Sequence, residues 1–282
     1  DYEPSANEIK LFYNSVFVAD NIKEACPEHL VNFKGVLDCP ELPLNVSRSY
    51  LQNDAYIRKI TSHISKKVAD KLNAMFNNER EALESKWKDM KPYFEYACMR
   101  DEKFGDKVRD KILYEKASGG FCTVSEYLGD KDEGTVYYTT DKEAQSYYLG
   151  LFADKGTEVI IFESIIDNNF AQYLESKNDK IKFRRIDSGF EETESEGNEG
   201  LKELFKKAMG NEEADISFSA LGEDGAAALI SLPEEGRRFA EMMKMYSSQG
   251  MGMGMFPVSE TLVLNANHPL VSYITENQDG EN

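Results

Sequence analysis

Few side chains in this sequence have a type and spacing that could support chemistry by themselves. Cys26 and His29 could share one face of a helix, but no second ligand pair has metal spacing, so we expect an ordinary thiol and imidazole there rather than zinc. Cys39 precedes Pro40 and could be a nucleophile, yet no neighbouring base or helix start explains a thiolate. The residues therefore predict no metal centre and give no basis for a catalytic triad.

A second candidate is the segment from Gly35 to Gln52, which contains one arginine. Pro40 and Pro43 remove backbone donors and force extended or turning backbone. This pattern predicts an ordered loop through residues 35–46 rather than a helix. From the residues alone, the simplest interpretation of Arg48 is a surface arginine that forms a local salt bridge.

A third candidate is a cluster of methionines. Six of the ten methionines fall within the fourteen residues from Met242 to Met255. Flexible thioethers form adaptable apolar surfaces that suit varied partners. Phe239, Met242, Met243 and Tyr246 have helical spacing, however, which by itself is more typical of a core helix. Both interpretations stay open at this point.

The elements that would position these residues follow from hydrophobic periodicity. Residues 9–19 are rich in β-branched and aromatic types and predict one strand or two short strands. A short helix is expected around residues 27–33. From residue 47 to residue 90 there is neither proline nor glycine, and apolar residues recur every three or four positions, which predicts one long helix.

The period changes between residues 104 and 190. Strands are predicted at 135–140, 158–163 and 181–186, separated by helices at 142–154 and 166–177, with Asp141 as the first helix's N-cap and Gly156 after its end. Alternating strands and helices imply a parallel sheet with right-handed crossovers. The turn after the first strand contains no glycine, so a nucleotide fold is not expected here.

The C-terminal third follows an acidic segment. Residues 187–200 contain many acids and neither lysine nor arginine. This composition predicts a linker and a domain boundary. A helix at 201–209, strands at 215–220 and 226–232, a helix at 234–248 and a strand at 261–264 then predict a small α+β unit. The last strand leads into Leu264–Val271, followed by a polar end.

Composition limits the classes of function. The 282 residues include 33 basic and 51 acidic side chains, a net charge of −18, so nucleic acid is not an expected partner. No apolar run approaches the length of about 20 residues that a membrane span needs. Four cysteines without a disulfide framework favour a reducing cytoplasm. The sequence begins at Asp1 rather than Met, and we expect it to be a truncated fragment.

Several segments together resemble a known family. The order Gly35-Val36-Leu37-Asp38, then Leu42-Pro43-Leu44-Asn45-Val46-Ser47-Arg48, then Leu51-Gln52 resembles the middle-domain catalytic loop of the ninety-kilodalton heat-shock protein (Hsp90) chaperone family. Val16–Asp20 is similar to the preceding family strand, and Leu264–Val271 to a C-terminal-domain segment. The resemblance covers almost the whole chain and extends to the bacterial members of the family.

The resemblance implies a fold in the α/β and α+β classes. Residues 1–48 would be the end of a large αβα layer with the catalytic loop, and residues 49–103 a long helical connector. Residues 104–190 would form a small αβα sandwich with a parallel sheet, followed by an acidic linker at 191–200. Residues 201–282 would be a truncated α+β C-terminal domain for dimerisation and client binding.

The resemblance also implies roles for two residues of the loop. Arg48 would reach the γ-phosphate of ATP bound with Mg in the separate N-terminal domain, and Gln52 would assist. A planar, permanently charged guanidinium matches phosphate oxygens and stabilises charge during phosphoryl transfer. Many relatives carry an acid where this chain has Ser49 and a serine where it has Cys39, and neither departure touches the roles of Arg48 and Gln52. The chain alone would bind no ATP and be inactive, because the nucleotide domain is absent.

For the C-terminal domain, the resemblance implies a surface for unfolded or partly folded client proteins. This surface would be formed by Met242, Met245, Tyr246 and Phe239. The intact protein would be a homodimer. The predicted function is therefore ATP-dependent chaperone activity in the cytoplasm, without nucleic-acid or membrane partners. Two alternatives are a non-enzymatic interaction scaffold that uses the α/β layer and acidic linker, and an independent thiol enzyme around Cys39.

Overall fold

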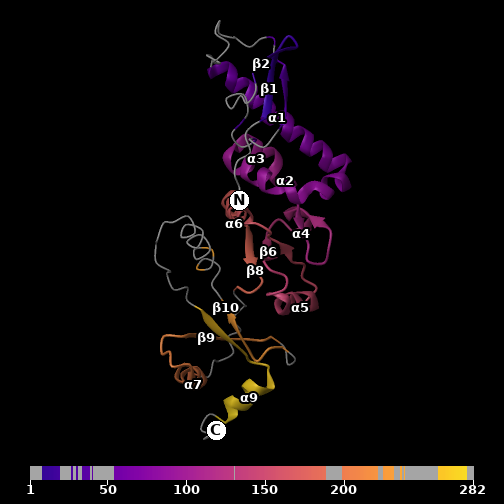
Figure 1. The fold of residues 1–282 in the computed structure, drawn as a ribbon. Coiled ribbons are helices and arrows are strands. Elements are labelled where there is room, and N and C mark those ends of the chain that lie inside the picture. Colours follow the sequence, from indigo (N-terminus) through magenta and orange to yellow (C-terminus); the bar gives the residue numbers. More distant parts are fainter. Residues whose placement is uncertain are drawn as a thin grey trace. The chain divides into compact units, whose positions relative to one another are not determined.

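The structure is a computed structural model in which helices alternate with several small sheets (Figure 1). It describes residues 8–19, 27, 30, 34–38, 40, 54–129, 131–188, 199–221, 225–231, 236, 238 and 260–277. The chain forms two compact units, Asp1–Gly134 with Phe162–Ile181, and Thr135–Ile161 with Lys182–Asn282. The mixture of helices and sheets agrees with the predicted α/β and α+β classes. The predicted layers and domain boundaries remain predictions.

The first unit begins with a three-stranded sheet in the order β2-β1-β3. β1 (Glu8–Tyr13) and β2 (Val16–Ala19) form an antiparallel hairpin, which confirms the prediction of two short strands. The turn residues Asn14 and Ser15 have φ of 49° and 63°, a left-handed conformation that matches the twist of a tight hairpin. β3 (Lys34–Asp38) pairs with β1 in parallel.

The start of the predicted loop at 35–46 is therefore wrong, because residues 34–38 are a strand. Pairing with β1 gives these residues backbone partners that the local sequence does not reveal. The prolines that suggested a loop come only after the strand ends at Asp38.

The single long helix predicted for residues 47–90 is also corrected. Two helices are present, α1 (Asp54–Asn78) and α2 (Arg80–Arg100). Between them Glu79 has φ −137° and ψ 41°, which is not helical. α2 continues past the predicted end at residue 90 and contains Pro92. Proline inside a helix removes a backbone hydrogen bond and lowers stability. In α2 this loss is offset by burial of side chains such as Trp87 and Phe94.

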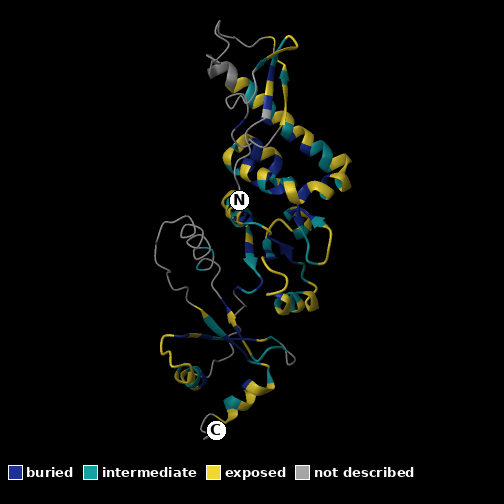
Figure 2. Cartoon of the chain, in the orientation of Figure 1, coloured by how far each residue is buried: buried dark blue, intermediate teal, exposed yellow. Residues whose placement is uncertain are grey.

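An aromatic core joins α2 to α3 (Glu102–Val108), which leads into the short helix η3 (Arg109–Lys111). The rings of Trp87 and Phe94 stack with centroids 5.8 Å apart, and Phe94 stacks on Phe104 at 6.2 Å. All three side chains are buried. Figure 2 shows dark-blue, buried segments on these helices. Aromatic stacking of this kind adds to the hydrophobic gain of burial.

The sequence reading did not find the elements between residues 109 and 128. β4 (Tyr114–Glu115) and β5 (Phe121–Cys122) form a short antiparallel pair, and α4 (Val124–Leu128) follows. Thr123 and Glu126 form a capping box at the start of α4, with reciprocal hydrogen bonds of 3.1 and 2.8 Å. The Thr-x-x-Glu pattern was the available signal for this helix.

The three strands predicted between 135 and 186 are all present, in the order β7-β6-β8. β6 (Gly134–Thr139) pairs in parallel with the short β7 (Ile160–Ile161), and β8 (Ile181–Arg185) lies on the other side of β6. The two predicted helices are also present, as α5 (Ser146–Asp154) and α6 (Ile165–Lys177).

The predicted ends of the first of these helices are only half right. Gly156 has φ +65°, as expected of a glycine beyond a helix end. Asp141 caps the turn that precedes α5 and not α5 itself, since its carboxylate accepts hydrogen bonds from the backbone N–H groups of Glu143 and Ala144. α5 begins later, at Ser146, with Gln145 as its N-cap.

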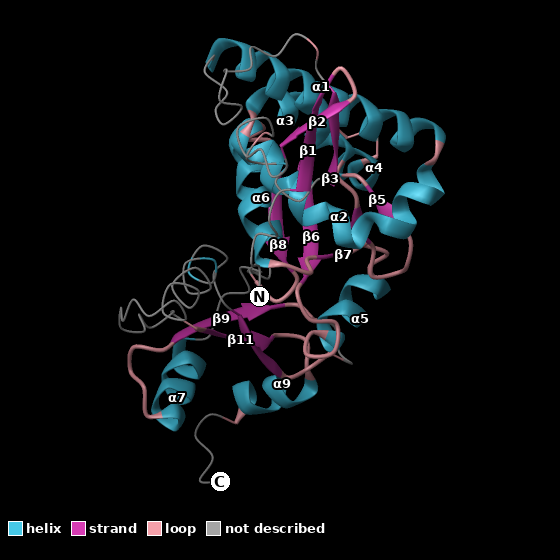
Figure 3. Ribbon diagram, turned by 45° about the horizontal axis from the view of Figure 1, so that its top comes forward, coloured by secondary structure: helices cyan, strands magenta, loops and turns pink. Residues whose placement is uncertain are grey.

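The C-terminal part of the second unit is built on the sheet β10-β11-β9. β9 (Asp215–Ser219) runs parallel to β11 (Thr261–Asn265), and β10 (Ala228–Ser231) runs antiparallel to it. Figure 3 shows α7 (Glu199–Met209) and α9 (Pro269–Glu276) beside this sheet. α9 was not predicted. The core between them contains Leu201, Ile216, Phe218, Leu264 and Val271.

The structure adds one finding about membranes: none of the described helices combines the length and apolar character needed to cross a bilayer.

Candidate functional site

The six side chains predicted to act in function all lie outside the residues that the structure describes. Arg48 and Gln52 fall between Pro40 and Asp54, and the four client-binding candidates fall between Arg238 and Glu260. Their roles therefore remain predictions. The structure nevertheless describes residues on both sides of each of these two segments. The four client-binding candidates are Phe239, Met242, Met245 and Tyr246.

The segment that contains Arg48 starts from the end of β3. There, Asp38 accepts a hydrogen bond of 2.9 Å from the backbone N–H of Ser15 and a longer one, 3.4 Å, from its hydroxyl. Ser15 is in the β1–β2 turn, where its N–H would otherwise point to solvent. The last residue of β3 is thus fixed to the hairpin of its own sheet.

The same segment returns to the fold at α1, which begins at Asp54. Ile64 and Val68 of α1 pack against a core formed by Ile9 and Leu30, to which Leu37 of β3 also contributes. Because β3 and α1 share this core, both elements that flank residues 39–53 are attached to one small structural unit. Such a frame is what a loop needs if it must present a charged side chain in a repeatable position.

Polar contacts attach α1 in turn to α3. The carboxylate of Asp101 accepts hydrogen bonds from the Ser65 hydroxyl, at 3.1 Å, and from the Phe104 backbone N–H, at 3.2 Å. The second of these bonds caps the start of α3. One turn further along, Lys107 forms an ion pair of 3.1 Å with Asp70. α1 is therefore held to α3 at two levels along its length.

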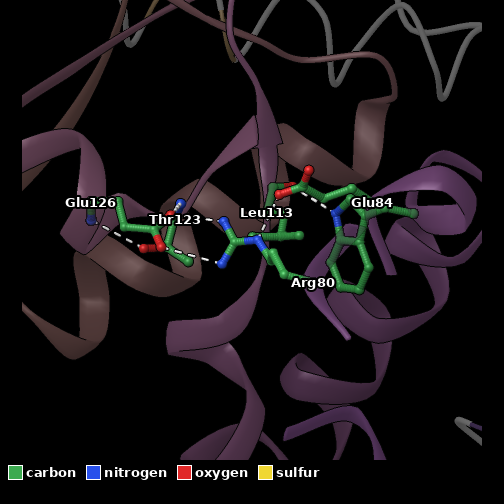
Figure 4. Close-up of polar contacts among 6 residues, drawn as sticks. Arg80, Glu84, Leu113, Thr123 and Glu126 are labelled. Carbon is green, nitrogen blue, oxygen red and sulfur yellow. Dashed lines mark hydrogen bonds and ion pairs between the residues drawn. The ribbon is translucent and has the colours of Figure 1, made fainter. Parts of the chain in front are cut away.

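Arg80 connects the start of α2 to α4 (Figure 4). Its Nε donates to Glu84 at 2.6 Å, and its two terminal nitrogens donate to the two carboxylate oxygens of Glu126 at 3.2 and 2.9 Å. The guanidinium also lies 4.4 Å from the centre of the Phe76 ring. This is the bidentate, stacked geometry for which arginine and lysine are not interchangeable.

The contacts of Glu126 affect its acidity. Burial alone would raise the pKa of this carboxyl, but the hydrogen bonds from Arg80 and from the Thr123 backbone outweigh it, so the pKa lies below its ordinary value. Glu126 therefore stays ionised near neutral pH, where it both caps α4 and accepts from Arg80. The sequence reading missed this pair because the two residues are 46 positions apart.

The turn after β6 tests whether nucleotide phosphate could bind to this sheet. Three of its backbone N–H groups already have acceptors within the chain. Gln145 Oε1 accepts from the Thr140 N–H at 3.1 Å, and Asp141 Oδ1 accepts from the N–H groups of Glu143 and Ala144 at 3.0 Å each. A phosphate at this turn would meet the Asp141 carboxylate instead of free donors. The turn does not fit a nucleotide.

The described residues provide neither a metal-binding cluster nor a reactive thiol. In the part of the chain that the structure describes, no three acidic, histidine or cysteine side chains gather to hold a metal ion. Cys98 and Cys122 are buried thiols outside any disulfide, and burial raises the pKa of the Cys98 thiol far above its ordinary value. Cys26, His29 and Cys39 lie outside the described residues.

The segment Leu264–Val271, singled out in the sequence, forms the junction between β11 and α9. The fully buried Asn265 accepts hydrogen bonds from the backbone N–H groups of Leu221, at 3.0 Å, and Asn267, at 3.1 Å. His268 is the N-cap of α9, where its Nδ1 accepts from the Leu270 N–H at 3.1 Å, and Pro269 opens the helix. The polar residues of this segment thus have structural roles.

Exposed apolar side chains accompany this junction. Leu270 and Tyr273 of α9 are 51% and 64% exposed, and Ile230 of β10 is 53% exposed. The opposite side of α9 is buried, since Val271 belongs to the core. The helix is therefore apolar on both sides, a pattern that burial in this unit alone does not explain.

Comparison with known proteins gives a consistent result. The family model described as Hsp90 protein matches residues 1–281. The chain is 36% identical to the chaperone protein HtpG of Porphyromonas gingivalis, in an alignment that covers 95% of this chain and 42% of the relative. It is 34% identical to that of Bacteroides fragilis, covering 98% and 44%, and 27% identical to that of Myxococcus xanthus, covering 94% and 43%.

A family match across nearly all of its residues shows what kind of protein this is: the chain belongs to the Hsp90 family. Within that family, its curated relatives are bacterial HtpG chaperones. The chain spans less than half the length of these relatives.

Proposed function

We propose that the intact protein to which this chain belongs is a molecular chaperone that uses ATP hydrolysis to remodel non-native proteins. One observation carries the proposal, namely the Hsp90 family match over residues 1–281. The relatives with 32–36% identity, each named as chaperone protein HtpG, support it. The finer assignments below rest on the resemblance of particular segments to the family.

For ATP hydrolysis, the proposed groups are Arg48 and Gln52. Arg48 reaches the γ-phosphate of ATP that is bound with Mg in a separate N-terminal domain of the same protein, and Gln52 assists. A guanidinium that arrives from another domain can complete a site only when that domain docks, so hydrolysis is coupled to closure. The attachment of β3 and α1 to one core supports this role, because both ends of the segment are anchored.

The nucleotide itself is expected to bind elsewhere in the intact protein. The turn after β6 has three of its N–H donors occupied and offers no cradle for phosphate. We therefore infer that this chain contributes the arginine side of a composite site and does not hydrolyse ATP alone. ATP with Mg would be held by the N-terminal domain.

For client binding, the proposed surface contains Met242, Met245 and Tyr246, with Phe239 beside them. Thioethers and an aromatic ring can adapt to unfolded proteins of different sequence. The exposed Leu270 and Tyr273 of α9, in the same unit, support an apolar surface in this part of the molecule. In the intact homodimer, two such surfaces would act on one client.

An aggregation assay with the intact protein tests this function. A heat-denatured client should stay soluble in the presence of the protein, and ATP should change the yield of refolded client. The triple variant Met242→Ser, Met245→Ser, Tyr246→Ser should suppress aggregation less while its melting temperature is unchanged. Met209→Ser, which changes a 51% exposed methionine of α7, is the matched control and should behave as the parent protein. A steep fall in the melting temperature of the triple variant would show that its residues are core.

A further inference from the structure

Three ionisable side chains are buried together in the first unit. Lys91 and Glu95 lie one turn apart on α2, and Asp167 lies in the first turn of α6. Their exposed fractions are 5%, 0% and 1%. Burial of charge is costly unless each charge is matched by an opposite charge and by hydrogen bonds, so the partners of each group decide its state.

Asp167 has the partners that an ionised carboxylate needs. Its Oδ2 accepts from the backbone N–H of Glu163 at 3.1 Å, from the N–H of Ser164 at 2.8 Å and from the Ser164 hydroxyl at 3.0 Å. Its Oδ1 forms an ion pair with Lys91. The N-terminus of α6 also favours negative charge at this position. Asp167 is therefore the anion of the cluster.

Lys91 is the only cation among the three, and its charge is already matched. Besides the ion pair with Asp167, its Nζ lies 4.5 Å from the centre of the Tyr114 ring and 5.9 Å from that of Phe162. Glu95 Oε1 is 3.9 Å from the same nitrogen, which is beyond hydrogen-bond distance. Lys91 thus contacts Asp167 closely and Glu95 only at long range.

Glu95 lacks the partners that Asp167 has. Neither of its carboxyl oxygens accepts a hydrogen bond from the described residues. An ionised Glu95 would be a second buried anion beside one matched cation, and it would face the Asp167 carboxylate without a proton between them. Burial first, and then the negative charge of Asp167, raise the pKa of Glu95 well above its ordinary value, although Lys91 opposes this.

We propose that Glu95 is a neutral carboxylic acid in the folded protein at neutral pH, and that it donates a hydrogen bond to Asp167, so that the attachment of α6 to α2 is a pH-sensitive clasp. The proton on Glu95 gives this carboxyl group a hydrogen-bond partner, which neither of its oxygens otherwise has among the described residues. The proposed hydrogen bond would join two residues, Glu95 and Asp167, that are 72 positions apart in the chain. Loss of the proton leaves two anions facing each other across the two helices.

The other titratable groups near Glu95 are neutral and do not compete for the proton. Burial is the first cause of a raised pKa at both Tyr114 of β4 and Cys98 of α2. The charged groups that act on Cys98 from further away are Asp101, Arg109 and Asp110. Within the part of the chain that the structure describes, the charged groups that act on the pKa of Glu95 are Lys91 and Asp167.

The direction of the pH effect follows from proton binding. The folded state holds the Glu95 proton at a pH where the unfolded chain has released it. Stability from this group is therefore fully present below the ordinary glutamate pKa and is lost as pH rises toward the raised pKa of the folded state. In that window, one retained proton lowers the folding equilibrium constant by up to about tenfold per pH unit.

Infrared difference spectroscopy of the intact protein at neutral pH tests the protonation directly. A carboxylic-acid C=O stretch should be present in the parent protein and missing in Glu95→Gln, whose amide keeps the donor to Asp167. The matched control is Glu102→Gln, which changes an exposed glutamate paired with Lys177 and should keep the band. If the parent and Glu95→Gln spectra show the same acid bands, Glu95 is ionised and the proposal is wrong.

Hydrogen exchange along α6 tests the clasp. After correction for intrinsic exchange rates, protection of the α6 amides should fall as pH rises from the ordinary glutamate pKa into the alkaline range in the parent protein, and stay constant in Glu95→Gln. If Glu95→Gln does not fold, the parent protein still decides the question. Protection of α6 that does not change over this range contradicts the proposal.

Discussion

The indole N–H of Trp87 donates a hydrogen bond of 2.8 Å to the backbone carbonyl of Leu113. Both residues have no exposed surface, and they are 26 positions apart. The bond ties α2 to the strand segment that follows η3, and it satisfies the one polar atom of a large buried ring. The hydrophobic core of the first unit is therefore also fixed in register by a specific polar contact.

This bond leads to the first prediction. Trp87→Phe removes the donor, leaves a smaller ring and deprives the Leu113 carbonyl of its partner, so the free energy of unfolding should fall by about 1–3 kcal/mol. Urea unfolding followed by circular dichroism measures the change. Tyr96→Phe, which alters a side chain that is 41% exposed, is the control and should cost about 0.5 kcal/mol or less. Equal effects of the two changes would contradict the buried hydrogen bond.

A second prediction concerns the contact of α3 with α2. A Cβ added at Gly105 would lie 2.7 Å from the Cys98 carbonyl oxygen and 2.7 Å from the Tyr173 hydroxyl. The carbonyl belongs to the backbone and cannot move freely, so Gly105→Ala should destabilise the fold by about 1–3 kcal/mol.

Gly150 is the matched control for this change. It also lies in a helix, α5, but a Cβ there would meet nothing within 4 Å. Gly150→Ala should therefore stabilise the protein slightly, by about 0.5–1 kcal/mol, because alanine loses less backbone entropy on folding. Thermal unfolding of both variants should give shifts of opposite sign, and shifts of the same sign would contradict the predicted close approach.

A third prediction concerns Arg80 and Glu126. Arg80→Lys keeps the charge but loses the fork that contacts both oxygens of Glu126. The Glu126 side chain is 47% exposed, so solvent screening limits the expected loss to about 0.5–1 kcal/mol. Lys71→Ala, which removes a pair whose side chains are 64% and 52% exposed, should change stability by about 0.5 kcal/mol or less.

The same pair should show a defined pH dependence. The pKa of Glu126 is lowered in the folded state, so its contribution is present above the ordinary glutamate value and is lost as pH falls through the lowered pKa. The difference in stability between the parent protein and Arg80→Lys should therefore shrink in acid. A difference that is constant down to acid pH would show that the charge of Glu126 does not matter.

Local patterns predicted much of the fold. The strands and helices between residues 134 and 186 were all found, because alternating apolar runs and turn residues are local signals. The break at Glu79 was not found, since neither glycine nor proline marks it. Pro92 suggested a helix end, yet α2 continues through it because packing of Trp87 and Phe94 outweighs the lost backbone bond.

Contacts between distant residues could not be predicted from a single sequence. No sequence pattern near Glu95 predicts that it lies near Asp167. Likewise, no pattern near Arg80 predicts its hydrogen bond to Glu126. The residues of the candidate site were predicted in another way than the helices and strands. They were assigned from the resemblance to a family and not from hydrophobic periodicity. The family is confirmed, while Arg48, Gln52 and the client-binding residues remain predictions.

We propose that Arg48 completes the ATPase site of the intact protein from outside the nucleotide domain. The most direct measurement compares ATP turnover and nucleotide affinity in the intact parent protein with those in Arg48→Ala and Arg58→Ala, the latter an exposed arginine of α1 as control. We predict that Arg48→Ala lowers turnover by about 10³-fold or more, as for other arginines that act on a transferring phosphoryl group, while nucleotide affinity and the control are unchanged. Normal turnover in Arg48→Ala would contradict the account.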